Sequence, residues 1–269
     1  MRRIAFINEK GGSCKTTLAV NVAAWLATAR GARVLLCDLD TQGHAGKSLG
    51  VDVRSLPITI ADLLLEPEVQ VNEVLVPTPV EGLSLLPANK ALARFPLEVA
   101  ARADRERRLL DKLADLAGYD FVIFDAPPSM GLVTQNILLA AEEVVIPVAM
   151  TYFALDGCAE VQQTVETVRR ELGHEELRIS LVVPTLYRRT ALADAILAKL
   201  QENFPDQLCR TSLGWNVQID EAQSHGKTIW EHAPNSRGAQ ALEAIAREIL
   251  IRGAASSAGG GRTSKLSAS

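Results

Sequence analysis

A lysine followed by two threonines, close behind a pair of glycines, is the part of this sequence whose spacing most clearly indicates chemistry. Residues 7–17 read INEKGGSCKTT. They follow the phosphate-binding pattern G-x-x-x-x-G-K-[ST], except that Glu9 and Cys14 occupy its two glycine positions. A second lysine, Lys10, stands five residues before Lys15. The segment therefore has the lysine and hydroxyl of a phosphate-binding loop without its usual glycines.

Such a loop can bind phosphate through its backbone and through two side chains. Gly11 and Gly12 allow a tight turn that points N–H groups inward, and the N-terminus of a following helix adds a favourable dipole. Lys15 would reach the β- and γ-phosphates of a nucleotide, and the Thr16 hydroxyl would ligate Mg²⁺. The alternative is a glycine-rich turn that only links a strand to a helix.

Three aspartates stand at the ends of apolar, strand-like runs. Asp125 ends FVIFD, while Asp38 and Asp40 end LLCDLD. Ligands of an open α/β sheet bind at the carboxyl ends of its strands, and a strand-end aspartate holds the metal in many nucleotide hydrolases. Any one of these aspartates taken alone could be a turn former or a helix cap. All three together, after the Gly-Gly-x-x-Lys-Thr loop, favour one shared phosphate and magnesium site.

The elements that must position these residues alternate along the chain. Residues 3–8 and 33–38 are short apolar runs on either side of a helical stretch from about 15 to 29, which is a βαβ unit. Further apolar runs predict strands at 83–87, 121–125, 143–148 and 178–184. Apolar residues at three-and-four spacing predict helices at 104–116, 156–172, 190–204 and 238–251. The predicted fold is α/β, with a doubly wound, mostly parallel sheet covered by helices on both faces.

Composition narrows the class of protein. A chain of 269 residues, 48% of them hydrophobic, can form one large α/β domain. The four widely spaced cysteines suggest neither a disulfide framework nor a zinc site, and no apolar run is long enough to span a bilayer, so we expect a cytoplasmic protein. The net charge of -4 argues against a surface that is basic all over. We expect a domain of residues 1–252 and a flexible Gly/Ser/Ala-rich tail of residues 253–269, GAASSAGGGRTSKLSAS.

The sequence K-G-G-x-x-K-[ST] from Lys10 to Thr16 resembles the deviant Walker A loop of the ParA/MinD family of P-loop ATPases. In that family the extra lysine replaces the glycine requirement of the ordinary pattern. LLCDLDTQGHA is similar to the family segment D-x-D-P-Q-G-N-A, and YDFVIFDAPPSMGLVTQNIL is similar to Y-D-x-x-x-x-D-x-P-P-S-L-G. VIPV followed by YFALDG, and EAQSHGKTIWEHAPNSRGAQALEAIAREI, are similar to stretches of the chromosomal ParA (Soj-type) members. The resemblance covers about residues 1–252.

The resemblance implies an ATPase that uses ATP and Mg²⁺, turns over slowly by itself, and forms a homodimer around two nucleotides. Lys10 would cross to phosphates held by the partner subunit and stabilise charge on the transferring phosphoryl group. Asp40 would support the attacking water, with Asp38 nearby, and Asp125 would be the Walker B acid. The implied catalytic residues are Lys10, Lys15, Asp40 and Asp38. The implied nucleotide contacts are Lys10, Gly11, Gly12, Ser13, Cys14, Lys15, Thr16, Thr17 and Asn216, and the implied metal residues are Thr16, Asp40 and Asp125.

The resemblance also implies macromolecular partners. These are non-specific duplex DNA, bound weakly by the ATP dimer, and a ParB-like or cargo-adaptor protein that stimulates hydrolysis; no membrane is expected. Arg189 matches a family DNA-contact position and Arg188 lies beside it, although a solvated pair of charges is the alternative. In the ATP state the protein is expected on the nucleoid. The cargo could be a replicon or a protein assembly such as a chemoreceptor array or a microcompartment, and the sequence favours neither.

Two departures from the family pattern lie in or near the nucleotide site. Thr41 replaces the proline of D-P-Q, and Cys14 takes a loop position that is commonly glycine. Neither change removes a phosphate or metal ligand. Cys14 is either a small loop residue or a thiolate whose pKa is lowered by the helix N-terminus and Lys15.

A third group of departures lies in the segment TSLGWNVQID, which in the family contributes to the adenine pocket and the DNA-binding surface. Gly214 replaces a proline there, and Trp215 and Gln218 replace two arginines. Trp215 could stack on adenine or on DNA, or pack in the core. Losing two arginines predicts weak, steeply salt-dependent DNA binding unless other cations compensate. The candidates for compensation are Arg210, Lys227 and Arg237.

Three other functions are disfavoured by particular features of the sequence. A MinD-like membrane switch would need a basic amphipathic C-terminal helix, and the tail has no apolar face. An ATPase like the nitrogenase iron protein would need cysteines that bridge an iron–sulfur cluster, and Cys158 stands alone after Asp125. A degenerate scaffold without turnover is disfavoured because the chain retains Lys10, Lys15, Asp40 and Asp125.

Overall fold

The centre of the molecule is a sheet of eight strands in the order β3-β4-β2-β5-β1-β6-β7-β8. The computed structural model describes residues 1–259, with side chains as far as Gly253. The strands are β1 (Arg2–Phe6), β2 (Val34–Asp38), β3 (Val76–Pro77), β4 (Leu83–Leu86), β5 (Phe121–Asp125), β6 (Glu143–Ala149), β7 (Arg178–Tyr187) and β8 (Leu213–Gly214). All pairings are parallel except that between β3 and β4. The predicted mostly parallel sheet is confirmed.

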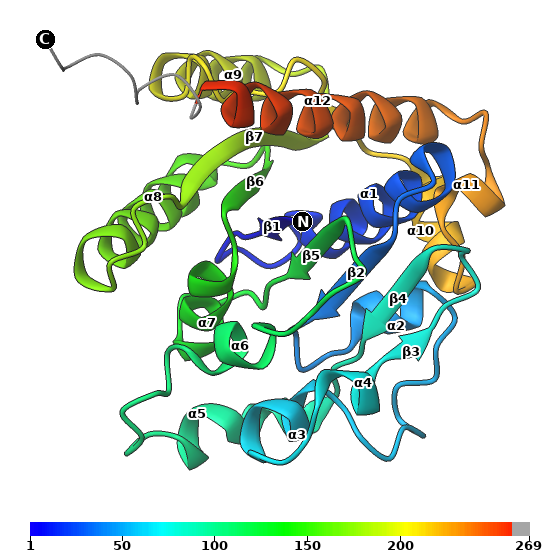
Figure 1. Cartoon of the computed structure of the whole chain (residues 1–269). Coiled ribbons are helices and arrows are strands. Elements are labelled where there is room, and N and C mark those ends of the chain that lie inside the picture. The colour runs from blue at the N-terminus through cyan, green and yellow to red at the C-terminus, as the bar shows by residue number, and fades with distance from the viewer. Residues whose placement is uncertain (260–269) are drawn as a thin grey trace, which may run out of the picture.

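Helices cover both faces of the sheet (Figure 1). One hydrophobic cluster lies between the sheet and a layer of α3 (Ile60–Leu65), α4 (Val71–Val74), α5 (Phe95–Glu98), α6 (Arg108–Lys112), α7 (Leu132–Ala140), α8 (Ala154–Glu171) and α9 (Ala191–Asn203). A second cluster lies between the sheet and α1 (Lys15–Arg30), α2 (His44–Ser48), α10 (Val217–Ser224), α11 (Ile229–His232) and α12 (Arg237–Gly259). A short 3₁₀-helix, Lys90–Arg94, precedes α5. This is the doubly wound arrangement that the sequence predicts.

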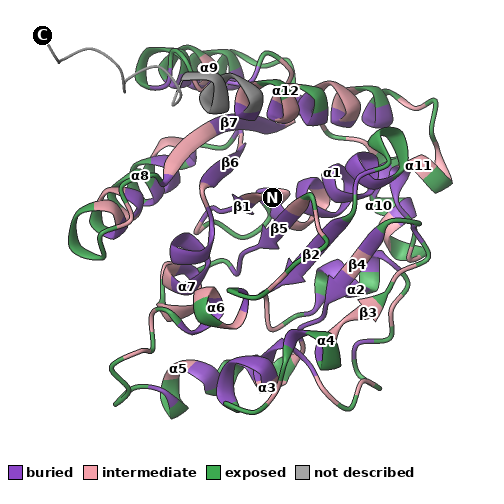
Figure 2. Ribbon diagram, in the orientation of Figure 1, coloured by how far each residue is buried: buried purple, intermediate pink, exposed green. Residues whose placement is uncertain are grey.

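The central strands are buried along their whole length, which explains their continuous apolar runs. All five residues of β2 are buried, and so are four of the five in β5 (Figure 2). Helix α1 is also buried, without a break from Leu18 to Ala27. A helix that is apolar on all sides lies inside a fold rather than on its surface. The element that follows the phosphate-binding loop is therefore held rigidly in the core.

Two predictions about helices differ from the structure. The predicted helix at 104–116 is helical only over α6, because residues 103–107 form turns and i to i+3 hydrogen bonds end the helix at Leu113. The predicted tail begins too early, because α12 continues to Gly259. Alanine is the strongest helix former, so the segment after Gly253 can extend a helix without an apolar face. Residues 260–269 lie outside the described part of the chain.

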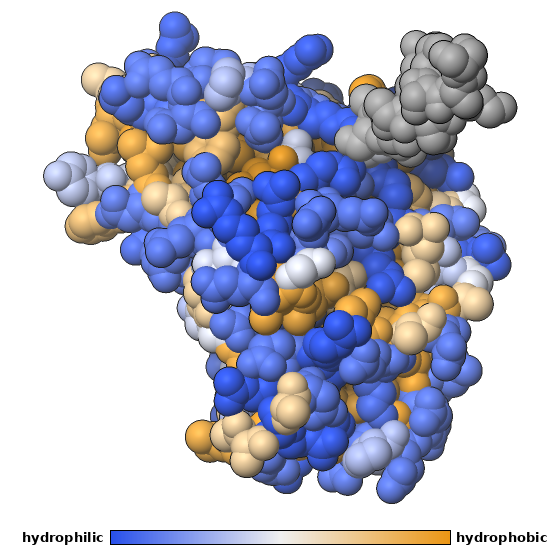
Figure 3. All heavy atoms as spheres, turned by 60° about the vertical axis from the view of Figure 1, so that its left-hand side comes forward, coloured by the Kyte–Doolittle hydropathy of each residue, from blue (hydrophilic) through white to orange (hydrophobic). Residues whose placement is uncertain are grey.

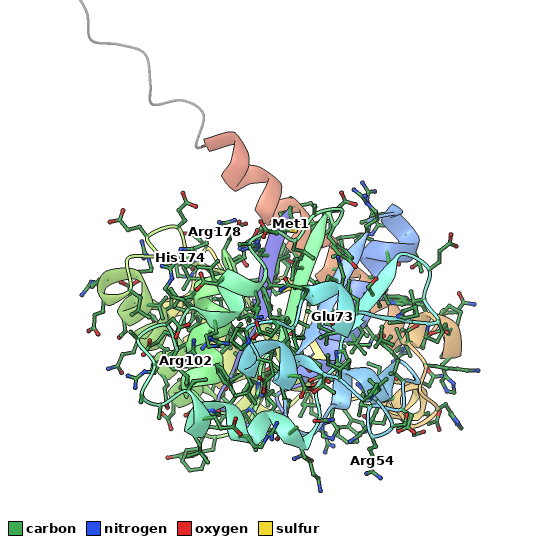
Figure 4. All side chains as sticks on the ribbon, turned by 60° about the horizontal axis from the view of Figure 1, so that its bottom comes forward. Met1, Arg54, Glu73, Arg102, His174 and Arg178 are labelled. Carbon is green, nitrogen blue, oxygen red and sulfur yellow. The ribbon has the colours of Figure 1, made fainter. Side chains whose placement is uncertain are left out.

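The predicted site lies at the carboxyl ends of the strands. In the sheet register Asp125 pairs with Phe6 of β1 on one side and with Asp38 of β2 on the other. Figure 4 shows Met1 and Arg178, which precede or begin strands, at one end of the molecule and Arg54, beyond the end of β2, at the other. The loop after β1 therefore leaves the sheet beside both aspartates.

The helices and the surface were compared with what a membrane protein requires. None of the helices within residues 1–259 is long and apolar enough to cross a bilayer. The face shown in Figure 3 is mostly hydrophilic, with small and separate hydrophobic areas.

Candidate nucleotide-binding site

The loop between β1 and α1 has the backbone of an anion-binding turn. Gly12 has φ 72° and Cys14 has φ 68°, both in the left-handed region. Cys14 is the N-cap of α1, yet no side chain accepts the hydrogen bonds of the first turn, and that turn contains no acidic residue. Because the first N–H groups of a helix need an acceptor and its dipole favours negative charge, the end of α1 is suited to hold a phosphate.

The Lys15 side chain folds back across this loop. It is only 7% exposed, and its Nζ donates to the Lys10 carbonyl oxygen at 3.1 Å. Burial lowers its pKa, while the negative charges of Asp125 and Asp40 oppose that effect. The ammonium group therefore lies close enough to Asp125 and Asp40 for their negative charges to act on it.

Asp125 is the most unusual group of the site. It is fully buried, and neither carboxylate oxygen has a hydrogen-bond partner among the described residues. Burial raises the pKa of this carboxyl well above its usual value; the negative charge of Asp38 adds to the rise, and the nearby Thr16 hydroxyl and Lys15 oppose it. Buried carboxylates are normally paired or bound to metal. An unpartnered carboxylate beside a threonine hydroxyl fits the Mg²⁺ that the loop implies.

The described residues contain no group of three or more His, Cys, Asp or Glu side chains that could hold a metal ion by themselves. Mg²⁺ in nucleotide enzymes is bound by one or two protein oxygens together with substrate phosphates and water. Asp125 and Thr16 are the two side chains that fit this role.

Asp38 is held by hydrogen bonds to the backbone of the following turn. Its carboxylate accepts hydrogen bonds from the backbone N–H groups of Asp40, Ala45 and Gly46 at 3.1, 3.0 and 3.3 Å. It is fully buried, which raises its pKa to about 7, and the backbone hydrogen bonds partly oppose that rise. Asp38 thus fixes the turn that carries Asp40 and the start of α2. Direct action of Asp38 on the reacting atoms stays a prediction.

A cavity of about 710 Å³ opens over this loop. Its volume is within the range of small-molecule sites. Of the predicted site residues, those that line it are Gly11, Gly12, Ser13, Cys14, Lys15, Thr16, Thr17 and Asp40. The buried Ser13 hydroxyl has no hydrogen-bond partner in the described part of the chain, so it could accept one from a ligand. The predicted residues Lys10, Asp38, Asp125 and Asn216 do not line the cavity.

Sequence reasoning missed one wall of this cavity. The lining residues that the sequence did not single out are Gln42, His44, Lys47, Ser48, Pro128, Leu186, Asp220, Gln223 and Ser224, and Trp215, weighed as a stacking residue, lines the cavity with them. Three of them come from α10, which is tied to the loop because Gln223 donates to the Thr17 hydroxyl at 3.0 Å. Helix α10 buries only Ile219 and Ala222, so its apolar pattern was too weak to predict a helix.

Lys10 points to a different surface. Its backbone N–H donates to Asn8, whose side chain donates to the Pro147 carbonyl and so ties the loop to β6. Its Nζ lies 3.2 Å from a Glu9 carboxylate oxygen and 5.8 Å from the centre of the Phe153 ring. The backbone of Lys10 is therefore fixed, while its charged end remains at the surface outside its own subunit's cavity.

Asn216 acts as the N-cap of α10. Its side-chain oxygen accepts from the Ile219 N–H at 3.3 Å, and Gly238 packs so closely that a Cβ there would lie 2.9 Å from the Asn216 Cγ. The structure thus assigns it a capping role, and its contact with nucleotide stays a prediction.

Two alternatives left open by the sequence are decided by burial. Burial raises the pKa of the Cys14 thiol to about 11, so the reactive-thiolate interpretation is wrong and Cys14 is a loop residue. Trp215 is 53% exposed, so the core-packing interpretation is also wrong.

Arg188 and Arg189 are both exposed, and the Arg188 guanidinium lies 5.6 Å from the centre of the Trp215 ring. Their contact with DNA stays a prediction.

A second hollow of about 570 Å³ lies near α6 but has no chemistry of its own. Lys112 donates to the carbonyls of Glu66, Pro67 and Val69, and Arg108 is buried and pairs with Asp104. These cations are already bonded within the protein. The side chains around this hollow therefore connect α6 to the neighbouring segments of the protein.

The fold and the site together define a P-loop nucleotide-binding protein with a deviant loop, and comparison with known proteins identifies its family. A family model described as an AAA domain matches residues 1–179. The chromosome-partitioning ATPase Soj of Thermus thermophilus is 42% identical over 254 residues, covering 94% of this chain and 96% of that protein. The sporulation initiation inhibitor protein Soj of Bacillus subtilis is 38% identical over 251 residues, covering 93% and 98%. The chain belongs to the Soj/ParA family of partitioning ATPases.

A solved structure agrees with this assignment at the level of the fold and the ligand. The cobyrinic acid a,c-diamide synthase from Mycobacterium smegmatis, with bound ATP analogue and magnesium, superposes with a TM-score of 0.82 at 33% identity. The match covers 95% of this chain and 97% of that one. The predicted fold class and the predicted family are both confirmed.

Proposed function

We propose that the protein is an ATP-dependent dimerising switch that positions DNA or another cargo and is reset by hydrolysis. One observation supports this most directly: the loop carries two lysines that point to different places. Lys15 crosses its own loop beneath the cavity, whereas Lys10 ends at the surface beside α8. A cation that lies outside its own site is suited to act in a site that a second subunit supplies.

In this proposal each part of the site has one task. The first turn of α1 and Lys15 hold the phosphates of ATP. Thr16 and Asp125 hold Mg²⁺, which when bound would neutralise phosphate charge as it develops. Asp40, positioned by Asp38, orients the attacking water. Lys10 stabilises charge on the phosphates of the partner's nucleotide, so turnover depends on dimerisation.

The dimer step is tested with Asp40→Ala. This change removes the group assigned to water and leaves the phosphate-binding loop intact. We expect the variant to bind ATP, to sediment as a dimer with ATP and Mg²⁺ but as a monomer with ADP, and to hydrolyse ATP more slowly than the parent. Asp115→Ala, at an exposed position, is the matched control. A variant that stays monomeric with ATP, or that hydrolyses ATP at the parental rate, would contradict the assignment.

To position a cargo, the ATP-bound dimer must also bind a larger structure in the cell. We propose that this structure is duplex DNA and that Arg189 contacts it. Phosphate contacts act on every sequence alike and weaken with salt. We expect mobility shifts at low salt with ATP but not with ADP, and weaker shifts for Arg189→Glu on random and defined DNA alike. Arg170→Glu, an equal charge reversal on α8, is the control. No shift with any nucleotide would remove DNA from the mechanism and leave a switch that acts through protein partners alone.

A further inference from the structure

A hollow of about 480 Å³ lies beside the nucleotide cavity and has a strongly basic lining. Three of its lining side chains are the cations Lys47, Arg54 and Lys90, and no carboxylate of the described residues lines it. The chain as a whole has a net charge of -4, so this concentration of positive charge is local. A concave surface lined by one sign of charge attracts ions of the opposite sign. This basic hollow is therefore suited to hold an anion.

Two cations of the basic hollow have no role within the protein itself. The exposed side chains of Arg54 and Lys90 have no ion-pair or hydrogen-bond partner among the described residues. Asp52 accepts a hydrogen bond from the Arg54 backbone N–H at 3.2 Å, not from the guanidinium. The hollow near α6 is different, because Lys112 and Arg108 there are bonded to carbonyls and to a carboxylate. Like charges that share one concave surface repel each other, and a bound anion would remove that repulsion.

The basic hollow is formed by three segments that are distant in the sequence and closely packed in the fold. Gly43 has φ 61°, and a Cβ there would lie 2.6 Å from the Ala88 carbonyl oxygen and 2.9 Å from Cγ2 of Val53. Only glycine allows the turn after β2 to lie this close to both segments. The Asn89 side chain caps the 3₁₀-helix that begins at Lys90. The lining side chains therefore extend from a backbone that is held in place.

Thr41, one of the departures from the family pattern, also lines the basic hollow. The family segment D-x-D-P-Q-G-N-A has a proline at this position, and proline has no side-chain donor. The Thr41 hydroxyl has no hydrogen-bond partner in the part of the chain that the structure describes. A hydroxyl can donate to an anion. The substitution thus adds a donor to a hollow that is already lined by cations.

The basic hollow adjoins the end of the nucleotide cavity at which hydrolysis is proposed to occur. Gln42 and Lys47 line both spaces. Asp40, assigned to the attacking water, lines the nucleotide cavity and directly precedes Thr41. The water attacks the γ-phosphorus, so the γ-phosphate is the part of ATP that lies at this end. The phosphate freed by hydrolysis therefore begins its exit beside the basic hollow.

We propose that Thr41, Arg54 and Lys90 form an anion subsite that receives the inorganic phosphate released by hydrolysis. The inference rests on the proposed function, because the role of Asp40 places the reacting phosphate at this end of the cavity. Lys47 lines both spaces, so the phosphate remains close to a positive charge as it moves from one to the other. Its transfer clears the γ-phosphate position while ADP is still bound.

Calorimetric titration of inorganic phosphate tests this subsite, both in nucleotide-free protein and in protein saturated with ADP and Mg²⁺. One variant combines Arg54→Ala with Lys90→Ala, and a second, Thr41→Val, removes the hydroxyl without changing the charge. The matched control combines Arg30→Ala with Lys199→Ala, which removes two exposed positive charges elsewhere. The ATP affinity and the melting temperature of each protein show whether its nucleotide cavity and its fold are intact.

In the ADP-bound state we expect the Arg54/Lys90 variant to bind phosphate roughly 5- to 30-fold more weakly than the parent, which is the value of two exposed ion pairs. Thr41→Val should bind phosphate roughly 2- to 12-fold more weakly, the value of one hydrogen bond. The Arg30/Lys199 control should match the parent. The inference would be overturned if the ADP-bound parent bound no phosphate, or if the parent and the Arg54/Lys90 variant bound it equally well.

The same variants in the mobility-shift assay show whether these cations contact DNA instead. A weaker DNA shift of the Arg54/Lys90 variant, with phosphate affinity unchanged, would overturn the inference and assign both cations to the DNA backbone. If the parent bound neither ATP nor ADP, the proposed function would be wrong. The difference in phosphate affinity between the nucleotide-free parent and the Arg54/Lys90 variant would still decide whether the basic hollow binds phosphate.

Discussion

Replacing Asp125 by asparagine should make the ligand-free protein more stable, although most changes at buried positions do the opposite. Asp125 is fully buried, and within residues 1–259 its carboxylate oxygens have no hydrogen-bond partner. Its charge therefore lowers the stability of the protein when no ligand is bound, and the raised pKa of the carboxyl reflects the same cost of burial. Asparagine has nearly the same shape and removes the charge. The site thus resembles other functional positions that sacrifice stability for binding.

The size of the effect follows from the missing partners. A buried polar group without a partner costs about 1–3 kcal/mol, and more if it is charged. The asparagine amide also remains unpaired, so we expect a net gain of about 1–2 kcal/mol in the free energy of unfolding. For a domain of this size that corresponds to a melting temperature higher by about 2–8 °C.

The assay is thermal unfolding in EDTA and then with ATP and Mg²⁺. Asp125→Asn should melt above the parent in EDTA, and it should gain less than the parent when ATP and Mg²⁺ are added, because a ligand stabilises only the state that binds it. Asp115→Asn, which removes an exposed charge, should change neither value. A lower melting temperature of Asp125→Asn than of the parent in EDTA would refute the inference that the Asp125 carboxylate destabilises the protein when no cation is bound.

Two further predictions concern pH and turnover. Burial raises the folded-state pKa of Asp38 from 3.8 to about 7, so the folded state holds a proton that the unfolded state releases. The free energy of unfolding without ligand should therefore fall as pH rises from about 4 to about 7, by at most about 1.4 kcal/mol per pH unit for this group. Melting temperatures that rise steadily from pH 5.5 to 7.5 would contradict this. Lys10→Ala should still bind ATP in calorimetry, because Lys10 lies outside the cavity of its own subunit. The variant should nevertheless lose most of its ATP hydrolysis. Unchanged hydrolysis would exclude the proposed role of Lys10 at the partner's nucleotide.

The sequence predicted those parts of the fold that depend on local pattern. The strands ending at Asp38 and Asp125 were found because both faces of the sheet are covered, which makes their sequences continuously apolar. The phosphate-binding loop was found because its chemistry requires Lys15 and Thr16 next to a tight turn. The short helix α10 was missed because its few buried residues give no clear period.

Features that depend on contacts between distant segments could not be read from the sequence. The capping of α2 by Asp38 requires the exact turn that brings Ala45 and Gly46 to the carboxylate. The exposure of Trp215 depends on the pairing of β8 with β7, about thirty residues away along the chain. A strand-end aspartate and an aromatic residue in a loop each fit several roles until that packing is known.

Calorimetric titration of ATP with Mg²⁺ into the parent and Lys15→Ala shows whether the loop after β1 holds the phosphates of ATP. Lys199→Ala, which removes an exposed lysine of α9, is the control, and circular dichroism verifies that all three proteins are folded. We expect ATP to bind to the parent and to Lys199→Ala, and not detectably to a folded Lys15→Ala. Binding of ATP to Lys15→Ala as tight as to the parent would show that the phosphates are held elsewhere.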